Sequence, residues 1–454
     1  MDTIVNLAKR RGFLFQGSEI YGGLQGTYDY GHYGSLLKNN IKAAWWRANV
    51  QQQRNMVGLD ASILMHPKVW EASGHTANFS DALVDDKITK KRYRADHLVE
   101  EQLKLKVEGL SNKDLTKIFQ ENEIKTPDGA KADWTEVRSF NLMFSTHAGP
   151  VASDDARIYL RPETAQGIFV DYKEVQATTR KKPPFGIAQI GKAFRNEITP
   201  GKFIFRLREF EQMEIEFFCP PTEAKKWHEW WMEERMRWYV EDLGITAANL
   251  HFRKHTDDEL SHYSAGTSDI EYKFPFGWSE LEGVANRTDF DLKAHMEASG
   301  KDLSYFDDAT KESYVPYVIE PSCGVDRIVF TALCDAYREE ADEKGDSRTV
   351  LKLAPALAPI KAAVLPLMKK PELTTLAESL WSELAPRFQT EYDETGSIGK
   401  RYRRHDEIGT PYCVTVDFDS LEDKAVTVRD RDSQQQQRIK ISELTAYLAE
   451  KLAI

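Results

Sequence analysis

Cysteine is scarce in this sequence, and long apolar runs are missing from it. Only four of the 454 residues are cysteines, and no two of them form a C-x-x-C pair, which argues against a zinc ribbon and against a disulfide framework. No stretch approaches the ~20 uninterrupted apolar residues of a membrane helix, and the apolar run before the first basic cluster is too short for a signal peptide. These absences predict a cytoplasmic protein with no zinc and no membrane contact.

Positive charge is also in short supply. The 61 lysines and arginines are outnumbered by 72 aspartates and glutamates, which gives a formal net charge of −11. A polyanionic partner would therefore have to meet local basic patches rather than the field of the whole molecule, and acidity alone does not exclude RNA. Because 41% of the residues are hydrophobic, a chain of this length can bury several cores and divide into roughly three domains.

The sequence changes character near Pro355. An acidic segment, REEADEKGD, is followed by the Pro- and Ala-rich stretch LAPALAPIKAAVLPL, which is typical of a linker that feeds a new strand. We therefore expect one unit at residues 1–350 and a small α/β domain at 355–454. In the second unit, the pattern predicts strands at IKAAVLPL and YCVTVDF, a helix at 372–386, a charged edge strand at KAVTVRDRD and a final helix.

Residues 95–137 interrupt the first unit. They are highly charged and helix-prone, whereas the sequence on either side is aromatic and strand-rich. We predict an inserted helical subdomain here, although a solvated pair of surface helices without a role is equally compatible with the pattern. Further along, four tryptophans at helical spacing within 225–243 are typical of core contacts rather than of a cofactor site.

A near match to a phosphate-binding loop occurs at residues 186–192. The pattern G-x-x-x-x-G-K-[ST] needs a hydroxyl after the lysine for magnesium, but Ala193 stands at that position and the segment alternates like a strand. There is also no H-E-x-x-H and no G-x-S-x-G motif. As a strand, the segment has one polar or small-residue face, which comprises Gln189, Gly191, Ala193, Arg195 and Glu197.

A second strand, FRLREFEQMEIEFF, carries an unusual face. Alternation predicts that arginines, one aromatic ring and then carboxylates share it, namely Arg206, Arg208, Phe210, Gln212, Glu214 and Glu216. A solvated surface would not need the ring. The face resembles a site for a nucleoside triphosphate followed by a cation, and a merely charged sheet face is the alternative.

A third segment, VPYVIEPSCGVDRIVF, predicts a strand that ends at Glu320, a turn of small residues, and a helix that begins near Gly324. Arg327 then falls in the first helical turn, where the helix dipole disfavours a cation. This position suggests a bound anion or a stacked base nearby, with a simple surface arginine as the alternative.

These segments, together with ASILMHPKVW, resemble the class II aminoacyl-tRNA synthetases. Further blocks are similar to the single-polypeptide, homodimeric glycyl-tRNA synthetases and run from residue 11 to beyond 413. They are RGFLFQGSEIYGG, YDYG, LKNNIKAAWW, RADHL, LRPETAQGIF, REFEQMEIEFF, EPSCGVDR and GKRYRRHDEIGTPYC. One departure is His32 and Tyr33 after YDYG, where the family has Pro and an aliphatic residue; it bears on a local turn and not on the chemistry.

The resemblance implies an α+β fold, with a class II antiparallel-sheet catalytic domain at 1–350, an insertion at about 95–137, and an α/β anticodon-binding domain at 355–454. It implies a ligase that attaches glycine to tRNA(Gly) with ATP, through glycyl-adenylate, and releases AMP and pyrophosphate. It also implies a homodimer, with ATP as substrate and Mg²⁺ accompanying it.

On matching positions, the resemblance makes Arg195 and Arg327 the catalytic residues. Arg195 would contact the α-phosphate, Arg206 the far phosphates of a bent ATP, and Phe210 and Arg327 would enclose adenine. Glu280 would contact ATP through magnesium. The whole ATP set is Arg195, Asn196, Glu197, Phe205, Arg206, Leu207, Arg208, Phe210, Glu280, Leu281, Gly324 and Arg327. Within this set, Glu197 would contact adenine or the tRNA end.

For glycine, the resemblance puts Glu163, Glu214 and Glu320 around the ammonium group, Ser322 beside the α-carbon, and Arg94 as a further contact. Three converging carboxylates should raise one another's pKa when no ligand is bound. The whole set is Arg94, Glu163, Phe210, Glu211, Gln212, Met213, Glu214, Glu320, Pro321, Ser322 and Gly324.

The C-terminal domain contains a basic run that is a candidate for tRNA phosphate contacts, namely Lys400, Arg401, Arg403 and Arg404. A salt-bridged face is the alternative, because two acidic residues follow directly. For the whole chain, three other readings remain: a class II synthetase for another small amino acid, a non-catalytic synthetase-like accessory subunit, and a structural RNA-binding protein.

Overall fold

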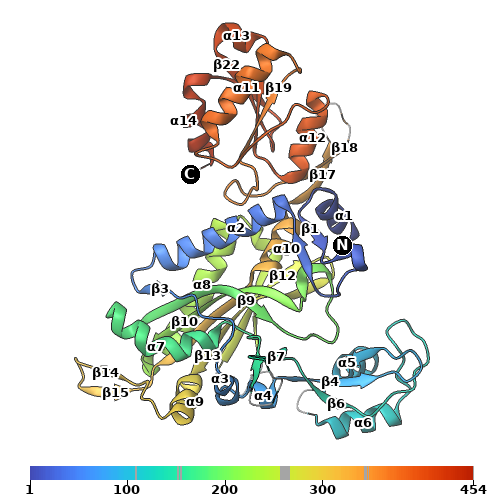
Figure 1. The fold of residues 1–454 in the computed structure, drawn as a ribbon, viewed down its shortest axis with the longest axis vertical. Helices are drawn as coiled ribbons and strands as arrows, with labels where there is room; N and C mark the ends of the chain where they lie inside the picture. The colour runs from blue at the N-terminus through green and yellow to red at the C-terminus, as the bar shows by residue number, and fades with distance from the viewer. Residues whose placement is uncertain are drawn as a thin grey trace.

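A computed structural model describes residues 1–454 except 108–109, 151–152, 154–155, 256–265, 342–344, 346 and 453–454. Along the longest axis, a C-terminal α/β domain lies at one end, a large sheet with its covering helices lies in the middle, and a small insertion module lies at the other end (Figure 1). In the described part of the chain, no helix is long and apolar enough to cross a membrane.

The central unit is built on an antiparallel sheet, which the described residues form from seven strands in the order β11-β12-β13-β16-β10-β9-β3. Only β3, at the edge, runs parallel to its neighbour. The strands are β3 (Met56–Gly58), β9 (Phe185–Phe194), β10 (Glu209–Cys219), β11 (Leu250–Lys254), β12 (Gly266–Phe274), β13 (Gly277–Thr288) and β16 (Tyr317–Gly324). The predicted strand at the loop-like motif is thus β9.

Helices cover one face of this sheet because their apolar stripes need a partner. The main ones are α2 (His32–Trp46), α8 (Ala224–Arg237) and α10 (Val325–Ala336). Trp231 and Trp238 are almost fully buried in the core between them, so the tryptophan stripe is a core feature, as the spacing predicted. Two further helices, α7 (Ala165–Thr179) and α9 (Phe290–Ser299), enclose a second apolar cluster on the opposite face of the sheet.

The glycines of the loop-like motif have a packing role. A Cβ atom on Gly191 would lie 2.2 Å from Nη2 of Arg161, and one on Gly186 would lie 2.4 Å from the sulfur of Met56. Arg161 itself is buried and donates to the carbonyls of Lys192 and Ala61 at 2.6 and 2.7 Å. These glycines are therefore explained by close packing and not by phosphate binding.

One predicted boundary is wrong. The strand β16 does not end at Glu320 but continues through Pro321 to Gly324, and α10 starts directly at Val325 without an intervening turn. Proline lacks the N–H that a strand donates to its neighbour. On the β10 side, neither Glu320 nor Pro321 has a paired residue. On the β13 side, Pro321 pairs with Val284. The proline thus sits where one ladder is interrupted.

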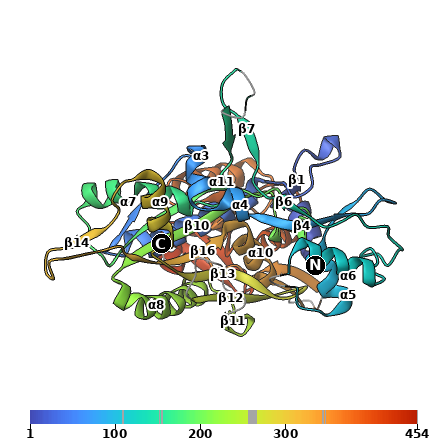
Figure 2. The ribbon, with the colours of Figure 1, turned by 90° about the horizontal axis from the view of Figure 1, so that it is seen from below.

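The insertion module contains the two predicted helices, α5 (Ala95–Leu103) and α6 (Asn112–Glu121), packed on a small sheet. The described strands of this sheet, β4 (Ser80–Asp85), β5 (Arg92–Arg94) and β6 (Arg138–Asn141), lie outside 95–137. Seen from below, the module lies to one side of the central sheet, and the hairpin of β7 (Ser145–His147) and β8 (Arg157–Tyr159) projects away from it (Figure 2).

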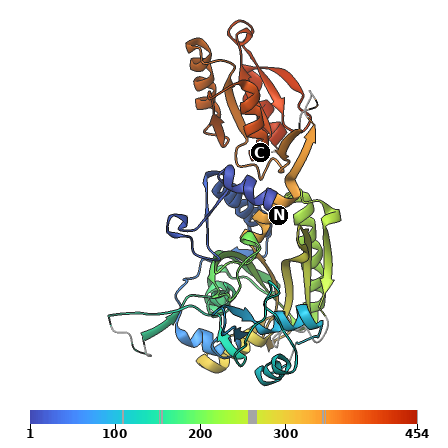
Figure 3. The same ribbon diagram turned by 90° about the vertical axis from the view of Figure 1, so that its right-hand side faces the viewer.

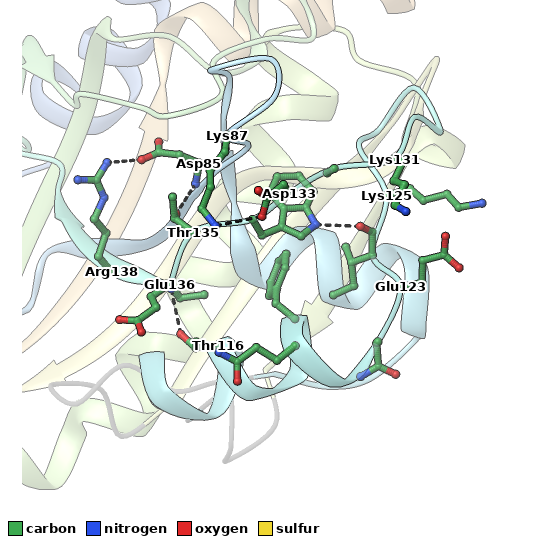
Figure 4. Close-up of a pocket in the computed structure, with 17 residues that line it drawn as sticks. Asp85, Lys87, Thr116, Glu123, Lys125, Lys131, Asp133, Thr135, Glu136 and Arg138 are labelled. Atoms are coloured by element: carbon green, nitrogen blue, oxygen red, sulfur yellow. Dashed lines mark hydrogen bonds and ion pairs between the residues drawn. The ribbon is translucent and has the colours of Figure 1, made fainter.

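A cavity of about 1030 Å³ opens in this module, between α6 and the segment that leads into β6 (Figure 4). Two ion pairs lie in its wall: Lys87 lies 3.0 Å from Asp133, and Arg138 lies 2.6 Å from Asp85. The indole N–H of Trp134 donates to a main-chain carbonyl at 2.8 Å. The lining therefore combines these paired groups and two aromatic rings with further charged side chains, such as Glu123, Lys131 and Glu136.

The C-terminal domain has a mixed sheet in the order β20-β19-β21-β22-β23 within the described residues. Its elements are β19 (Ala362–Pro366), α11 (Pro371–Leu384), β20 (Thr390–Tyr392), α12 (Ile398–Ile408), β21 (Tyr412–Val416), α13 (Asp419–Asp423), β22 (Ala425–Asp430), β23 (Gln436–Lys440) and α14 (Ile441–Leu452). The predicted edge strand is β22, and it is internal, because the glutamine-rich segment after it forms the edge strand β23.

The C-terminal domain lies against one end of the central unit (Figure 3), and a buried ion pair links the two. The hairpin of β17 (Tyr337–Ala341) and β18 (Ser347–Leu351) places Arg348 against Asp406 of α12 at 2.9 Å, and Arg429 reaches the same carboxylate at 2.8 Å. All three side chains are at most 7% exposed. Nearby, the hydroxyl of Tyr33 donates to Glu391 at 2.7 Å, so the departure from the family pattern at this position makes a contact between the two units.

Candidate active site

A cavity of about 410 Å³ lies on the face of the central sheet opposite to its main helices. It is lined by β10, β12, β13 and β16, by the segment between β9 and β10, and by the first turn of α10. Fifteen residues that the sequence predicted for ATP or glycine lie in its wall, namely Glu163, Arg195, Glu197, Phe205, Arg206, Leu207, Phe210, Gln212, Glu214, Glu280, Leu281, Glu320, Ser322, Gly324 and Arg327.

Arg195 marks one end of the cavity. It follows β9 directly, and its main chain pairs with Arg208 across the hairpin, which directs the side chain onto the cavity face. Its Nε donates to the carbonyl of Pro162 at 3.0 Å, and its guanidinium lies 5.3 Å from the ring of Phe210. Arg206 lies 4.0 Å from Glu197 on the same side. The guanidinium of Arg195 is thus oriented by a carbonyl and an aromatic face.

Arg327 lies in the first turn of α10, as the sequence predicted. Its guanidinium stacks 4.4 Å from the ring of Phe205 and donates to the carbonyls of Phe205 and Glu280 at 3.2 and 3.1 Å. Its Nη1 also lies 3.2 Å from the carboxylate of Glu280, and this charge holds the pKa of Glu280 below its usual value. The result is a flat cationic surface, of the kind on which an aromatic base stacks.

The far end of the cavity is acidic. Glu214 accepts hydrogen bonds from the hydroxyls of Ser322, at 2.8 Å, and Thr164, and from the amide of Thr164 at 3.1 Å. Glu320 is 2.7 Å from Arg287. Glu163 lies 3.4 Å from the imidazole of His75. The three predicted carboxylates therefore do meet, and each has its own set of partners.

The pKa values of the three acids diverge, which corrects the expectation that all would rise. Burial and the nearby Glu163 raise the pKa of Glu214. Burial raises the pKa of Glu320 to about 8, against the opposing charge of Arg287. Burial acts on Glu163 in the same direction, but His75 and Arg287 outweigh it, so its pKa falls well below the usual value. No pattern in the sequence indicated that His75 would lie here.

Six predicted site residues do not line this cavity. Glu211, Met213 and Pro321 alternate with lining residues and so face the other side of the sheet, where Glu211 pairs with Lys38 at 3.0 Å. Arg94 belongs to the insertion module and pairs with Asp81 and Asp96.

Asn196 and Arg208 complete that group, and both are adjacent to the wall. The amide of Asn196 donates to Leu142 at 2.7 Å, and Arg208 donates to the carbonyls of Glu197 and Gln25 at 3.0 to 3.1 Å. The alternation that predicted Arg208 for the site fails because β10 begins only at Glu209.

Several lining residues were missed, of which Arg287 is the most consequential. It bonds Glu320 at 2.7 Å and Asp291 at 2.8 and 2.9 Å. The others are Ile204, His255, Thr267, Asp269, Gly283, Ala285, Cys323 and Asp326. The alternation of Gly283, Ala285 and Arg287 along β13 was a signal that could have found three of them.

The basic run of α12 is not a uniform patch. Arg401 is 1% exposed and donates to the carbonyls of Pro366, Asp393 and Leu367, so it is a structural residue and the prediction of a phosphate contact is wrong for it. Arg404 pairs with Asp393 at 2.6 Å and remains partly exposed.

Comparison with known proteins decides the family. A glycine–tRNA ligase of Macrococcus caseolyticus (strain JCSC5402) is 59% identical over 458 residues, which cover 100% of this chain and 98% of the relative. One from Bacillus anthracis is 58% identical over 457 residues, covering 100% and 99%, and one from Staphylococcus aureus (strain JH9) is 57% identical over 459, covering 99% and 98%. The chain belongs to the glycine–tRNA ligase family.

Two family models agree with this assignment. Residues 148–343 match the class II tRNA synthetase core domain of the G, H, P, S and T enzymes, and residues 361–451 match the anticodon-binding domain. The predicted fold class is therefore confirmed: a class II core with an antiparallel sheet, followed by an α/β anticodon-binding domain. As a member of the glycine–tRNA ligase family, the chain is an aminoacyl-tRNA synthetase, and the accessory-subunit and RNA-scaffold readings are set aside.

Proposed function

We propose that the 410 Å³ cavity is where this glycine–tRNA ligase joins glycine to ATP and then passes the glycyl group to tRNA(Gly). The observation that carries the proposal is the charge division of one cavity. Arg195, Arg206 and Arg327 lie toward one end together with Glu197 and Glu280, and Glu163, Glu214 and Glu320 converge at the other around Arg287. A polyphosphate and an ammonium group are the ligands that such an arrangement suits.

In the first step, the glycine carboxylate attacks the α-phosphorus in line and pyrophosphate leaves. The nucleophile is already ionised, so no general base is required. Arg195 would stabilise the charge that develops on the α-phosphate, because its guanidinium is held in place before the reaction by Pro162 and Phe210. Arg327 and Phe210 would enclose adenine, and Arg206 would hold the far phosphates.

Glu280 fits the predicted magnesium ion. The carboxylate of Glu280 is about half exposed, and Arg327 keeps it ionised. A second carboxylate, Asp269, lies close by: burial raises the pKa of Asp269, and the charge of Glu280 raises it further. Hard oxygen ligands of this kind suit Mg²⁺, which when bound would neutralise phosphate charge.

Glycine selection follows from the acidic end. The ammonium group would lie among Glu163, Glu214 and Glu320, while the hydroxyl of Ser322, fixed by Glu214 at 2.8 Å, would stand beside the α-carbon. A methyl group there would meet a filled wall, so alanine is rejected by steric resistance rather than by a missing contact.

The remaining expectations concern assembly. We propose a homodimer, a catalytic domain at 1–350 and an anticodon-binding domain at 355–454 that contacts tRNA(Gly), within the cytoplasm. The match of residues 361–451 to the anticodon-binding model supports the second domain.

The decisive experiment is ATP–pyrophosphate exchange with each of the twenty amino acids in turn. Glycine should give the highest rate. Faster exchange with alanine or serine would instead support the ligase for another small amino acid.

A further inference from the structure

A fourth carboxylate, Glu216, lies behind the acidic end of the cavity. It follows Glu214 by two residues on β10 and is fully buried. Neither of its carboxylate oxygens has a hydrogen-bond partner among the described residues. Glu216 does not line the cavity, so a direct contact with substrate does not account for it.

The strand register brings Glu216 against Glu320. In the β10–β16 ladder, Glu214 pairs with Ser322 and Phe217 pairs with Ile319. Continuing this antiparallel register places Glu216 opposite Glu320, at the interruption next to Pro321. One carboxylate oxygen from each of Glu214, Glu216 and Glu320 lies within 4.8 Å of the others. Like charges opposite one another in a sheet repel, and burial strengthens the repulsion.

The charged groups around Glu216 come from four elements: Glu214 from β10, Glu320 from β16, Arg287 from β13 and Asp291 from α9. The single cation among these is bonded to Glu320 and to Asp291. On the other neighbouring strand, β9 places Ile187 opposite Glu216. The neutral Gln166 of α7 bonds Asp291 at 3.0 Å and the ring of His295 at 2.8 Å.

These surroundings disfavour an ionised Glu216. Burial, and then the charge of Glu320, raise its pKa well above the usual value, and Arg287 opposes them only in part. A buried carboxylate without a hydrogen bond is costly, whereas a neutral acid can donate its O–H to a neighbouring carboxylate. Glu320 is the neighbour across the strand.

We propose that Glu216 holds a proton and, as a neutral acid behind Glu320, positions the Glu320 carboxylate to receive the ammonium group of glycine. This inference rests on the proposed function of the cavity. Glu216 is a positioning residue and not a catalytic one. It adds a hydrogen-bond donor to the acidic end without adding a further negative charge beside the three lining acids.

The test uses two variants of the full chain. Glu216→Gln keeps the shape and an N–H donor but has no ionisable group, and Glu216→Met has similar size but no donor. The first should keep the glycine KM within about 3-fold of wild type and leave its pH profile unchanged. The second should raise the glycine KM about 10- to 100-fold, the range for one hydrogen bond to a charged group, with the ATP KM altered less than 2-fold.

A spectroscopic signature accompanies the kinetics. At pH 9, above the pKa of about 8 of Glu320, the wild-type protein should show an infrared band of a protonated carboxyl group, which shifts when glycine binds and is lost in Glu216→Gln. If Glu216→Met does not fold, the band and the glutamine variant still decide the question. Loss of glycine affinity in Glu216→Gln, wild-type affinity in Glu216→Met, or no band assignable to Glu216 would each overturn the inference.

Glu320→Gln separates this inference from the proposed function. If Glu320→Gln leaves the glycine KM unchanged, the ammonium site itself is misplaced and the proposed function of the cavity fails. If it raises the glycine KM while Glu216→Met does not, the cavity keeps its function and only the role of Glu216 is overturned.

Discussion

Replacement of Arg195 by alanine is the sharpest test of the proposed chemistry. The side chain makes one hydrogen bond, to the carbonyl of Pro162, and stacks near two aromatic rings, those of Phe79 and Phe210, without entering a core. Losing one such hydrogen bond costs about 0.5–1.5 kcal/mol of stability, so the variant should melt only a few degrees below wild type.

The kinetic loss should be far larger than the loss of stability. Removing one preorganised donor to developing charge costs about 10²- to 10³-fold in turnover, equivalent to about 2.7–4 kcal/mol of transition-state stabilisation. Glycine-dependent ATP–pyrophosphate exchange measures this step directly. The expected pattern is a greatly reduced kcat with a smaller change in the ATP KM, because the contact strengthens as charge develops.

Arg208→Ala is the matched control. Arg208 is the same residue type in the segment just before β10, it does not line the cavity, and its guanidinium is occupied by the carbonyls of Glu197 and Gln25. It should lose stability without a comparable loss of kcat. Wild-type exchange by a well-folded Arg195→Ala, or equal kcat losses in the two variants, would refute the role given to Arg195.

Three further predictions concern specificity, pH and the junction between the units. Ser322→Gly should accept alanine as a substrate, measured as alanine-dependent ATP–pyrophosphate exchange. Continued rejection of alanine would show that another side chain occupies the space beside the α-carbon. Because the ammonium group binds an ionised Glu320, whose pKa is raised to about 8, the glycine KM should rise as pH falls through 8 while the ATP KM changes less; a glycine KM that is flat from pH 9 to 6 would contradict this. Asp406→Ala removes the carboxylate that Arg429 and Arg348 share, while Arg348 keeps its pair with Glu340, and should cost about 3–5 kcal/mol in denaturant unfolding without lowering exchange by the folded protein. Unfolding at the wild-type denaturant concentration would show that the pairs contribute nothing.

Alternation in the sequence predicted the central strands well, because a side-chain period of two is a local property. Thus Gln212 and Glu214 on β10 reach the cavity, and the strand at the loop-like motif is present as β9. The same rule fails for Arg208, since the strand starts after it. The sequence also predicted that the strand before Pro321 ends at Glu320, but pairing within the sheet extends this strand, β16, to Gly324.

Non-local partners account for most of what the sequence could not predict. Nothing near His75 in the chain indicates that it will face Glu163, and Arg287 meets Glu320 only because β13 and β16 are neighbours. The same holds for Arg401, whose residue type suggested a surface cation but whose three carbonyl partners come from two other segments. Residue types therefore identified the candidate site residues, but contacts between segments distant in the sequence determine the partners and the charge state of each.

The contacts between the two units have a consequence for how a long substrate is bound. Detaching the C-terminal domain would break the Arg348–Asp406 pair and the Tyr33–Glu391 hydrogen bond, while Arg429 would move with Asp406, so these contacts favour one placement of the domain. The distance between the catalytic cavity and the C-terminal domain is therefore set before the substrate binds. A tRNA of matching length would bind both units with little entropic cost of ordering the domains. A short RNA that ends before the C-terminal domain would not benefit from this arrangement.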